Sequence, residues 1–274
     1  MSPFAPSVFR AAALAFCAAS TAGADTIPLN NDFSSGGLEN TGLFTQPGGG
    51  VLRYTVTTNN SANPPVAYSS SQLTNAANTS FTLSTQFAIT SIGTTGLTQS
   101  VAIGFFGVDA AFSGAAATPY LTASYTFTNG TMSITEVDGT NTVLGTTSAF
   151  DLNGATTGFI SASPTLYTLK LGVTSLGSGT YSLSFGLFDA AGTTQVAPSS
   201  ALNVASYSIA STTTDTDVNP NGFYGIRARL PQTSGTTTAE FSDFSATAIP
   251  EPSTYAALAG LGALGLAAFR RRRA

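Results

Sequence analysis

Apolar side chains recur at every second position in short runs along most of this 274-residue chain, and no other feature narrows its possible folds so much. One such run aligns four large apolar residues on one side: Tyr181, Leu183, Phe185 and Leu187. Because successive side chains of a β-strand point to opposite faces, a period of two indicates strands with one buried face. Gly, Asn, Asp and Pro separate the runs, as is typical of turns. The sequence therefore predicts an all-β body.

About ten strands are expected, at spacings typical of a sandwich of two sheets. The runs at 167–173 and 181–187 should pair as a hairpin. A second hairpin is predicted from Tyr120 to Val137, where Asn129-Gly130 favours a two-residue turn of type I′ that sets Phe127 opposite Met132. The remaining strands are expected at 51–57, 81–89, 100–108, 201–209, 222–230 and 239–247.

The first 24 residues have the pattern of a secretory signal peptide. Arg10 supplies the positive charge, residues 11–19 the apolar core, and Ala22-Gly23-Ala24 the cleavage signal. Cys17, the one cysteine of the chain, would be removed with the signal peptide, which excludes disulfides and thiolate chemistry from the mature protein. Residues 25–248 are then expected to form one exported domain, because about 225 residues suit a single all-β core.

The C-terminal segment, residues 249–274, has three distinct parts. Pro250, Glu251 and Pro252 cannot continue a helix and should be extended. Residues 255–269 carry no charge and predict a transmembrane helix about 22 Å long, which spans a hydrocarbon core of about 30 Å only marginally. The cluster Arg270, Arg271, Arg272 and Arg273 should hold the end of that helix in the cytoplasm.

These three parts, in this order and at the end of the chain, resemble the PEP-CTERM sorting signal of Gram-negative bacteria. The resemblance implies recognition by an exosortase, a membrane cysteine protease that removes the tail near Pro250-Glu251-Pro252. It also implies transient anchoring in the inner membrane, then delivery to a cell surface or extracellular matrix rich in exopolysaccharide or biofilm. A permanent single-pass anchor is the alternative, although such an anchor would usually be longer.

The body resembles the concanavalin A-like jelly roll of lectins and glucanases. The resemblance is carried by residues 100–108, the 167–187 hairpin, the segment 222–229 and the sequence Phe241-Ser-Asp-Phe244. It implies a jelly-roll β-sandwich. Legume-type lectins carry a sugar-binding Asp shortly before their Phe-Phe strand, but Val101 occupies the corresponding place here, so that role is not carried over.

The composition removes several classes of chemistry. The chain has no histidine, which excludes Ser-His-Asp triads and His-ligated zinc. Jelly-roll glucanases place their paired carboxylates in a Glu-x-Asp-x-Glu pattern, which Glu136 and Asp138 begin but Thr140 ends. Because Asp138-Gly139 is a turn dipeptide, we expect a solvated strand end there and no catalytic residue.

One loop offers oxygen ligands at alternate positions: Asp215, Asp217, Asn219 and Asn221. Such a loop can turn its side chains toward a hard cation such as calcium, but Ile226 stands where an EF-hand requires Glu, and a plain loop without metal shows the same pattern. We expect the plain loop and no cofactor, with calcium as the alternative.

Charge argues against a nucleic acid partner. Residues 25–269 hold all thirteen acids and only four bases, Arg53, Lys170, Arg227 and Arg229, so 4 minus 13 gives −9. Arg227 and Arg229 should share one face of a strand, where they either clamp an acidic sugar or, as we expect, pair with nearby carboxylates.

The sequence thus favours a non-enzymatic exported β-sandwich that binds or structures polysaccharide. A diverged glycan hydrolase or lyase and a purely structural coat protein are the alternatives.

Overall fold

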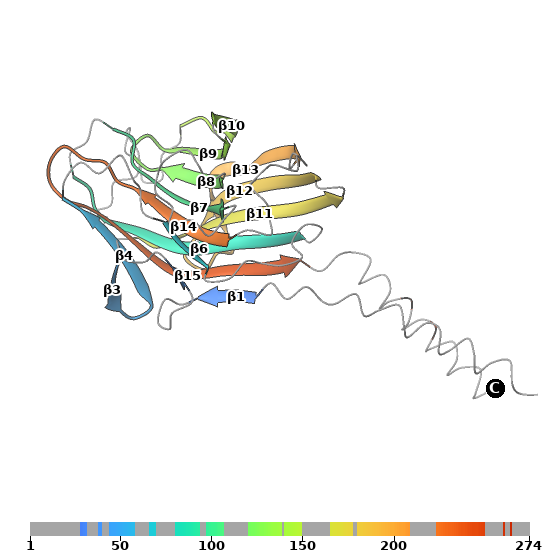
Figure 1. Ribbon diagram of the computed structural model, residues 1–274, viewed down its shortest axis with the longest axis horizontal. Helices are drawn as coiled ribbons and strands as arrows, with labels where there is room; N and C mark the ends of the chain where they lie inside the picture. The colour runs from blue at the N-terminus through green and yellow to red at the C-terminus, as the bar shows by residue number, and fades with distance from the viewer. Residues whose placement is uncertain are drawn as a thin grey trace, which may run out of the picture.

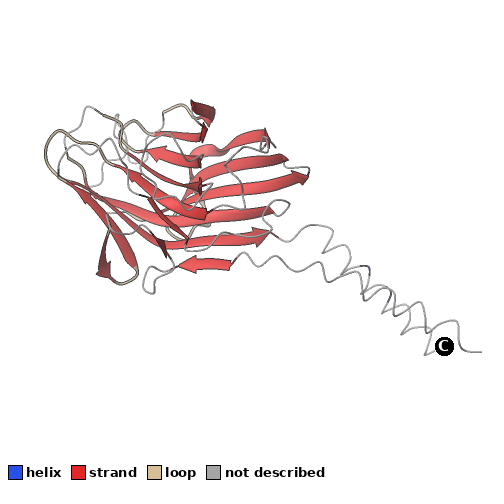
Figure 2. Ribbon diagram, in the orientation of Figure 1, coloured by secondary structure: helices blue, strands red, loops and turns tan. Residues whose placement is uncertain are grey.

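Fifteen strands of the described residues form two stacked antiparallel sheets in the computed structural model (Figure 1). The structure describes residues 28–31, 38–39, 44–57, 66–69, 80–93, 97–106, 120–138, 140–149, 165–177, 180–208, 223–249, 260 and 264. Figure 2 shows the strands gathered in two layers, as expected for a sandwich. The predicted fold class is confirmed: the body is a jelly-roll β-sandwich.

The eight-stranded sheet has the order β13-β12-β11-β6-β15-β4-β3, with β1 also paired to β15. Its strands are β1 (Pro28–Asn31), β3 (Thr45–Gly48), β4 (Val51–Val56), β6 (Ser80–Ser91), β11 (Tyr167–Gly177), β12 (Thr180–Phe188), β13 (Gln195–Ser208) and β15 (Thr237–Ile249). Because Pro28 pairs with Thr247, the first and last strands of the body lie side by side.

The seven-stranded sheet has the order β10-β9-β8-β7-β14-β5-β2. Its strands are β2 (Leu38–Glu39), β5 (Val66–Ser69), β7 (Ser100–Phe106), β8 (Tyr120–Thr126), β9 (Thr131–Asp138), β10 (Thr140–Thr146) and β14 (Phe223–Arg229). Strands β7, β8, β9 and β14 make up the middle of this sheet.

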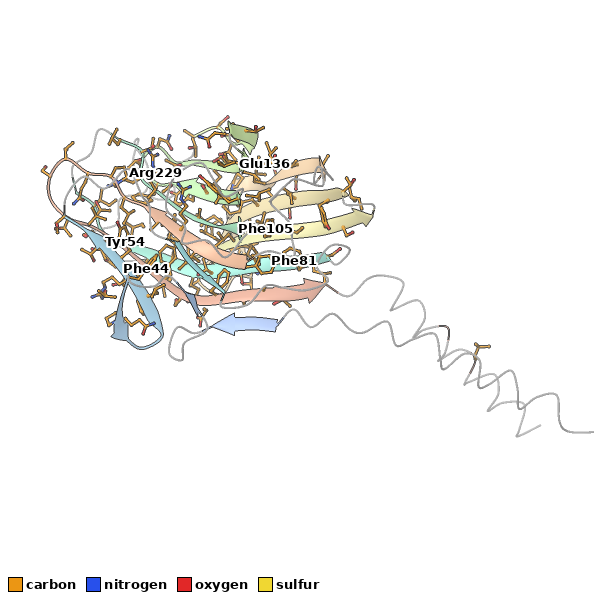
Figure 3. All side chains as sticks on the ribbon, viewed as in Figure 1. Phe44, Tyr54, Phe81, Phe105, Glu136 and Arg229 are labelled. Atoms are coloured by element: carbon orange, nitrogen blue, oxygen red, sulfur yellow. The ribbon has the colours of Figure 1, made fainter. Side chains whose placement is uncertain are left out.

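The core lies between the two sheets and is built from the alternating apolar residues of both. An aromatic triangle joins the layers. The ring of Phe81 on β6 lies 5.7 Å from that of Phe105 on β7 and 5.3 Å from that of Tyr224 on β14. Figure 3 labels Phe81 and Phe105. Phe105 and Tyr224 are 5.4 Å apart. All three side chains are at most 2% exposed. The alternation of apolar residues in the sequence thus predicted correctly which side chains face the core.

The strands that the sequence did not predict lack a clear apolar alternation. They are β1, β2, β3, β5 and β10. All four residues of β3 are exposed, and most of β10 is exposed as well. Strands β3 and β10 thus bury few side chains of their own, and they form because a neighbouring strand supplies hydrogen bonds. Strand β13 also begins at Gln195, six residues earlier than expected.

The β11–β12 hairpin is confirmed, with Ser175 opposite Tyr181 and Gly177 opposite Thr180. The β8–β9 hairpin forms, but its predicted turn was wrong: Thr126 pairs with Thr131, and Tyr125, not Phe127, lies opposite Met132.

Two observations explain the different turn between β8 and β9. A type I′ turn needs positive φ at both central residues, and of the pair Asn129-Gly130 only Gly130 has it, at 69°. The fully buried Phe127 donates its N–H to the carbonyl of Gln99 (3.1 Å), so it is held in the turn and does not pair with β9. Because the register moves by two residues, the same side chains stay on the buried face.

Several predicted features lie outside the described residues. They are the signal peptide at 1–24, the loop with Asp215, Asp217, Asn219 and Asn221, the motif Pro250-Glu251-Pro252, the cluster Arg270–Arg273, and residues 255–269 apart from Gly260 and Leu264, which have helical backbone conformation. Among the described residues, no helix is both long and apolar enough to cross a membrane.

Candidate functional site

The outward face of the seven-stranded sheet is the strongest candidate for a functional surface. Its residues alternate with core residues, so they point away from the eight-stranded sheet. The strand register sets them in rows across β14, β7, β8 and β9. One row is Gly225, Gly104, Thr122 and Thr135; the next is Arg227, Ala102, Ser124 and Ser133; a third is Arg229, Ser100, Thr126 and Thr131. We call these twelve residues the outward face.

The outward face combines hydroxyl groups with a part that has almost no side chains. Every position that β8 and β9 contribute to it is Ser or Thr, whereas β7 and β14 contribute Gly104, Ala102 and Gly225 next to one another. These small residues are covered, because Gly104 and Gly225 are buried and Ala102 is 2% exposed. Thr122 is buried as well (2% exposed), while Ser124 and Thr135 are partly exposed. The Ser and Thr residues of β8 and β9 other than Thr122 thus form most of the accessible part of this face.

Gly104 is required by close packing. A Cβ atom built on Gly104 would lie 2.0 Å from the backbone oxygen of Leu121 on β8. Because backbone cannot yield as a flexible side chain can, any larger residue at this position would push β7 and β8 apart.

Arg227 crosses this face toward Tyr120. Its guanidinium carbon lies 5.3 Å from the centre of the Tyr120 ring, in a cation–π contact. The residue as a whole is partly exposed, but its Nε is buried and has no hydrogen-bond acceptor in the described part of the protein. Burial lowers the pKa of the Arg227 guanidinium, an effect that Tyr120 opposes and Arg229 reinforces.

Arg229 lies two residues further along β14 and is also partly exposed (Figure 3). Its Nη1 donates a hydrogen bond to Thr98 Oγ1 (2.9 Å). The sequence predicts that both arginines pair with carboxylates. Among the described residues neither does, and the ion pair found there joins Arg53 to Glu240.

A buried polar network fixes the segments at this end of the sheet. Gln99 Nε2 donates to the carbonyl of Pro231 (2.9 Å) and to Thr237 Oγ1 (3.0 Å). The N–H of Gln99 donates to Thr128 Oγ1 (3.1 Å) in the β8–β9 turn. Because these bonds join the segments before β7 and after β14, they hold Thr98 where Arg229 reaches it.

Strand β9 ends at Asp138, as the turn dipeptide Asp138-Gly139 predicted. Glu136, two residues before that end, pairs with Leu121 of β8 and with Thr142 of β10, and Asp138 pairs with Thr140. The sequence did not reveal β10, which returns beside this end of β9. Glu136 shares the inward side of β9 with Ile134 and is partly exposed, so it does not lie on the outward face.

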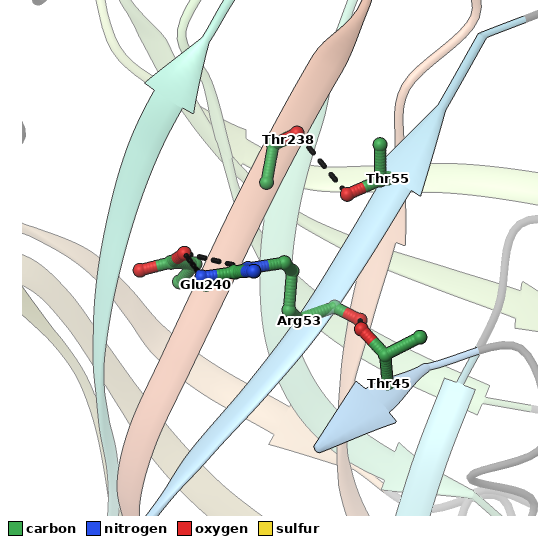
Figure 4. A network of polar contacts seen from close by, with 5 residues as sticks. All are labelled: Thr45, Arg53, Thr55, Thr238 and Glu240. Atoms are coloured by element: carbon green, nitrogen blue, oxygen red, sulfur yellow. Dashed lines mark hydrogen bonds and ion pairs between the residues drawn. The ribbon is translucent and has the colours of Figure 1, made fainter. Parts of the chain in front are cut away.

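The opposite face of the sandwich, on the eight-stranded sheet, is polar but internally paired (Figure 4). Arg53 Nη2 lies 2.6 Å from Glu240 Oε1, and Thr55 and Thr238 share a hydrogen bond of 3.1 Å. Its other cation, Lys170, has its Nζ 5.0 Å from the centre of the Phe188 ring. Because these polar side chains already contact one another or an aromatic ring, they are less available to bind a ligand.

No group of three or more His, Cys, Asp or Glu residues that could hold a metal ion occurs among the described residues. The possible calcium loop lies outside them.

Sequence reasoning missed Tyr120 and the hydroxyl rows. The rows were readable in principle: Thr122, Ser124 and Thr126 alternate with apolar residues, and so do Thr131, Ser133 and Thr135. Their alignment across β8 and β9 depends on the register that the sequence misassigned.

Solved structures define the class of fold. Lectin I-B4 from Griffonia simplicifolia, in its metal-free form, is similar with a TM-score of 0.51 at 11% identity, covering 82% of this chain and 100% of that one. The Lotus tetragonolobus seed lectin has a TM-score of 0.49 at 14% identity, covering 82% and 100%. An endo-1,3-β-glucanase from Streptomyces sioyaensis has 0.47 at 11%, covering 76% and 79%. The body is a concanavalin A-like sandwich, and at such identities the likeness concerns the fold alone.

The C-terminal segment matches a known sorting signal. Residues 248–273 match the PEP-CTERM protein-sorting motif, which confirms the predicted sorting signal. The motif indicates export and exosortase processing at the membrane of a Gram-negative bacterium. No curated protein matches the sequence.

Proposed function

We propose that the exported body is a non-enzymatic polysaccharide-binding module, and that it acts at the cell surface or in the extracellular matrix after the exosortase has removed the tail. The outward face of the seven-stranded sheet is the binding surface. The observation that carries the proposal is the set of partly exposed hydroxyl residues on β8 and β9: Ser124, Thr126, Thr131, Ser133 and Thr135.

The chemistry of that face suits sugars. Ser and Thr hydroxyls both donate and accept hydrogen bonds, as sugar hydroxyls do. The Arg227–Tyr120 pair adds a charged and aromatic boundary, while the opposite face has its polar groups paired with one another.

The proposal remains non-enzymatic because a glycosidase needs two carboxyl groups facing the same sugar. Glu136 lies on the inward side of β9, and the twelve described residues of the outward face include no carboxylate.

A binding assay tests the proposal with the full-length chain in mild detergent. Electrophoresis through gels containing dextran, a β-1,3-glucan or polygalacturonate should show retardation in at least one gel. Incubation with the same polymers should release no reducing ends and no unsaturated sugars. Absence of retardation by every polymer would support the structural coat protein instead, and release of products would support the hydrolase or lyase.

A further inference from the structure

We propose that the end of strand β15 controls removal of the tail: residues 245–249, which we call the terminal segment, must separate from the sheet before the exosortase cuts the chain. The inference goes beyond the proposed function and does not depend on polysaccharide binding. It starts from an overlap between the fold and the sorting signal. The sorting motif begins at residue 248, whereas β15 runs to Ile249, so the first two residues of the motif belong to the last strand of the body.

The terminal segment is held by two neighbouring strands (Figure 1). On one edge β6 pairs with β15 as far as Ile249, and Thr82 lies opposite Thr247. On the other edge β1 runs antiparallel to β15, with Pro28 opposite Thr247. The residue after Ile249 is Pro250, which has no N–H group and cannot continue the ladder of hydrogen bonds. The folded body therefore extends to the residue before the Pro-Glu-Pro motif.

A closed strand is a poor substrate for a protease. An extended peptide is bound through its backbone N–H and C=O groups, and in a paired strand these groups already bond to the neighbouring strands. Proteolysis of a folded protein therefore proceeds through a locally opened form, at a rate that follows the population of that form. A cut near Pro250-Glu251-Pro252 thus requires the residues just before it to leave the sheet.

Packing determines how far β15 can open. Phe244 is fully buried in the core between the sheets. No later residue of β15 with a described side chain buries a large group: Ser245 is partly exposed, Ala246 is buried but small, and Ile249 is 43% exposed. Ser245 shares a hydrogen bond of 2.8 Å with Ser84 of β6. The terminal segment can therefore open without disturbing the core, and Phe244 marks where the opening ends.

Strand β1 adds to this closure. Its residues Pro28–Asn31 pair with residues 244–247 of β15, on the edge that faces away from β6. A strand end that is paired on one edge opens more readily than one paired on both, because fewer hydrogen bonds must break. Deletion of residues 28–31 should therefore raise the population of the opened form, while residues 248–273 of the sorting motif stay unchanged.

The test follows tail removal from the full-length chain in Gram-negative cells that contain the exosortase, by mass spectrometry of the C-terminus at successive times. In the double variant Thr82→Cys/Thr247→Cys the two cysteines are directly opposite, at a Cα separation that a disulfide allows. The oxidising compartment outside the inner membrane forms the disulfide, which fastens the terminal segment to β6, and an added reductant opens it. The single variants Thr82→Cys and Thr247→Cys are the matched controls.

A second variant moves the motif away from the sheet. Insertion of Gly-Ser-Gly-Ser between Thr247 and Ala248 leaves residues 248–273 intact but places them beyond the paired part of β15. The same insertion between Gly48 and Gly49, in the exposed turn from β3 to β4, is its control. Thermal unfolding of each variant establishes that it is folded.

We expect the disulfide to slow tail removal about fivefold or more and the reductant to restore the wild-type rate. The insertion before Ala248 should speed removal about fivefold or more, since each hydrogen bond that no longer has to open raises the opened population by about that factor. The single cysteine variants and the insertion after Gly48 should be processed at the wild-type rate. If the disulfide variant does not fold, deletion of residues 28–31 decides, because it should also speed removal about fivefold or more.

Three results would overturn the inference. One is tail removal at the same rate with the disulfide formed and reduced. Another is the same rate for the wild type and for the chain with the insertion before Ala248. The third is an equal acceleration by the control insertion after Gly48. Faster removal after the insertion before Ala248, together with no effect of the disulfide, would mean that the bulk of the body and not its closed strand limits the exosortase.

Discussion

Replacing Phe81 with alanine should cost the sandwich a large part of its stability. The side chain is fully buried, and its ring contacts Phe105 and Tyr224 of the other sheet at 5.7 and 5.3 Å. Truncating a buried phenylalanine costs about 3–5 kcal/mol, against a total stability of about 5–15 kcal/mol for a typical domain. Taking about 3 kcal/mol per molar for the dependence on urea, the midpoint of unfolding should fall by roughly 1–1.7 M.

Urea unfolding followed by tyrosine fluorescence measures this change. Val143→Ala is the control, because Val143 is 60% exposed and its truncation should alter stability by no more than about 0.5 kcal/mol. The double variant with Phe105→Ala should show a coupling energy of about 0.5–1.5 kcal/mol beyond burial. A loss below about 1 kcal/mol for Phe81→Ala, with an unchanged slope, would show that the aromatic triangle does not hold the two sheets together.

Three further predictions concern an ion pair, a buried phenol and the sorting motif. A double-mutant cycle on Arg53 and Glu240 should give no more than about 1 kcal/mol, because the two side chains are 41% and 22% exposed; a value above about 2 kcal/mol contradicts this. Burial raises the pKa of the Tyr224 phenol well above its ordinary value of 10.0, so the stability from its neutral form is present below pH 10 and is lost as pH rises further. Tyr224→Phe should therefore lose less stability than the wild type between pH 9 and 11, and an equal loss refutes the assignment. Replacing Glu251 in the sorting motif should leave the tail attached in cells that contain the exosortase, and mass spectrometry of the C-terminus would detect Arg273; normal removal of the tail would refute the role of Glu251.

Strands could be predicted from the sequence where one face is buried and the other is exposed. Phe81, Leu183 and Phe185 were assigned to strands because they alternate with polar residues, and all three are buried. Strand β10 was not predictable, because most of its residues are exposed and its sequence carries no apolar period. That strand then determines the surroundings of Glu136, which is paired with β10 two residues before β9 ends.

The candidate site was predictable only in part. The alternation along β14 indicated that Arg227 and Arg229 share a face, but not what they meet there. Tyr120 lies more than a hundred positions away from Arg227 in sequence. It reaches Arg227 because β8 and β14 are the two neighbours of β7 in the sheet. A carboxylate was expected near Arg227 from charge alone, and an aromatic ring is there instead.

The sequence by itself determined which residues face the core, because a strand has a fixed period of two, and it determined the sorting signal, because that signal is a linear order of residues at one end of the chain. Tertiary structure decided the strand order, the register of β8 against β9, and thus which hydroxyls and which arginine share a surface. A shift by two residues leaves every side chain on its own face, so burial does not distinguish one register from the next. The packing of Phe127 in the turn distinguishes the observed register from the predicted one.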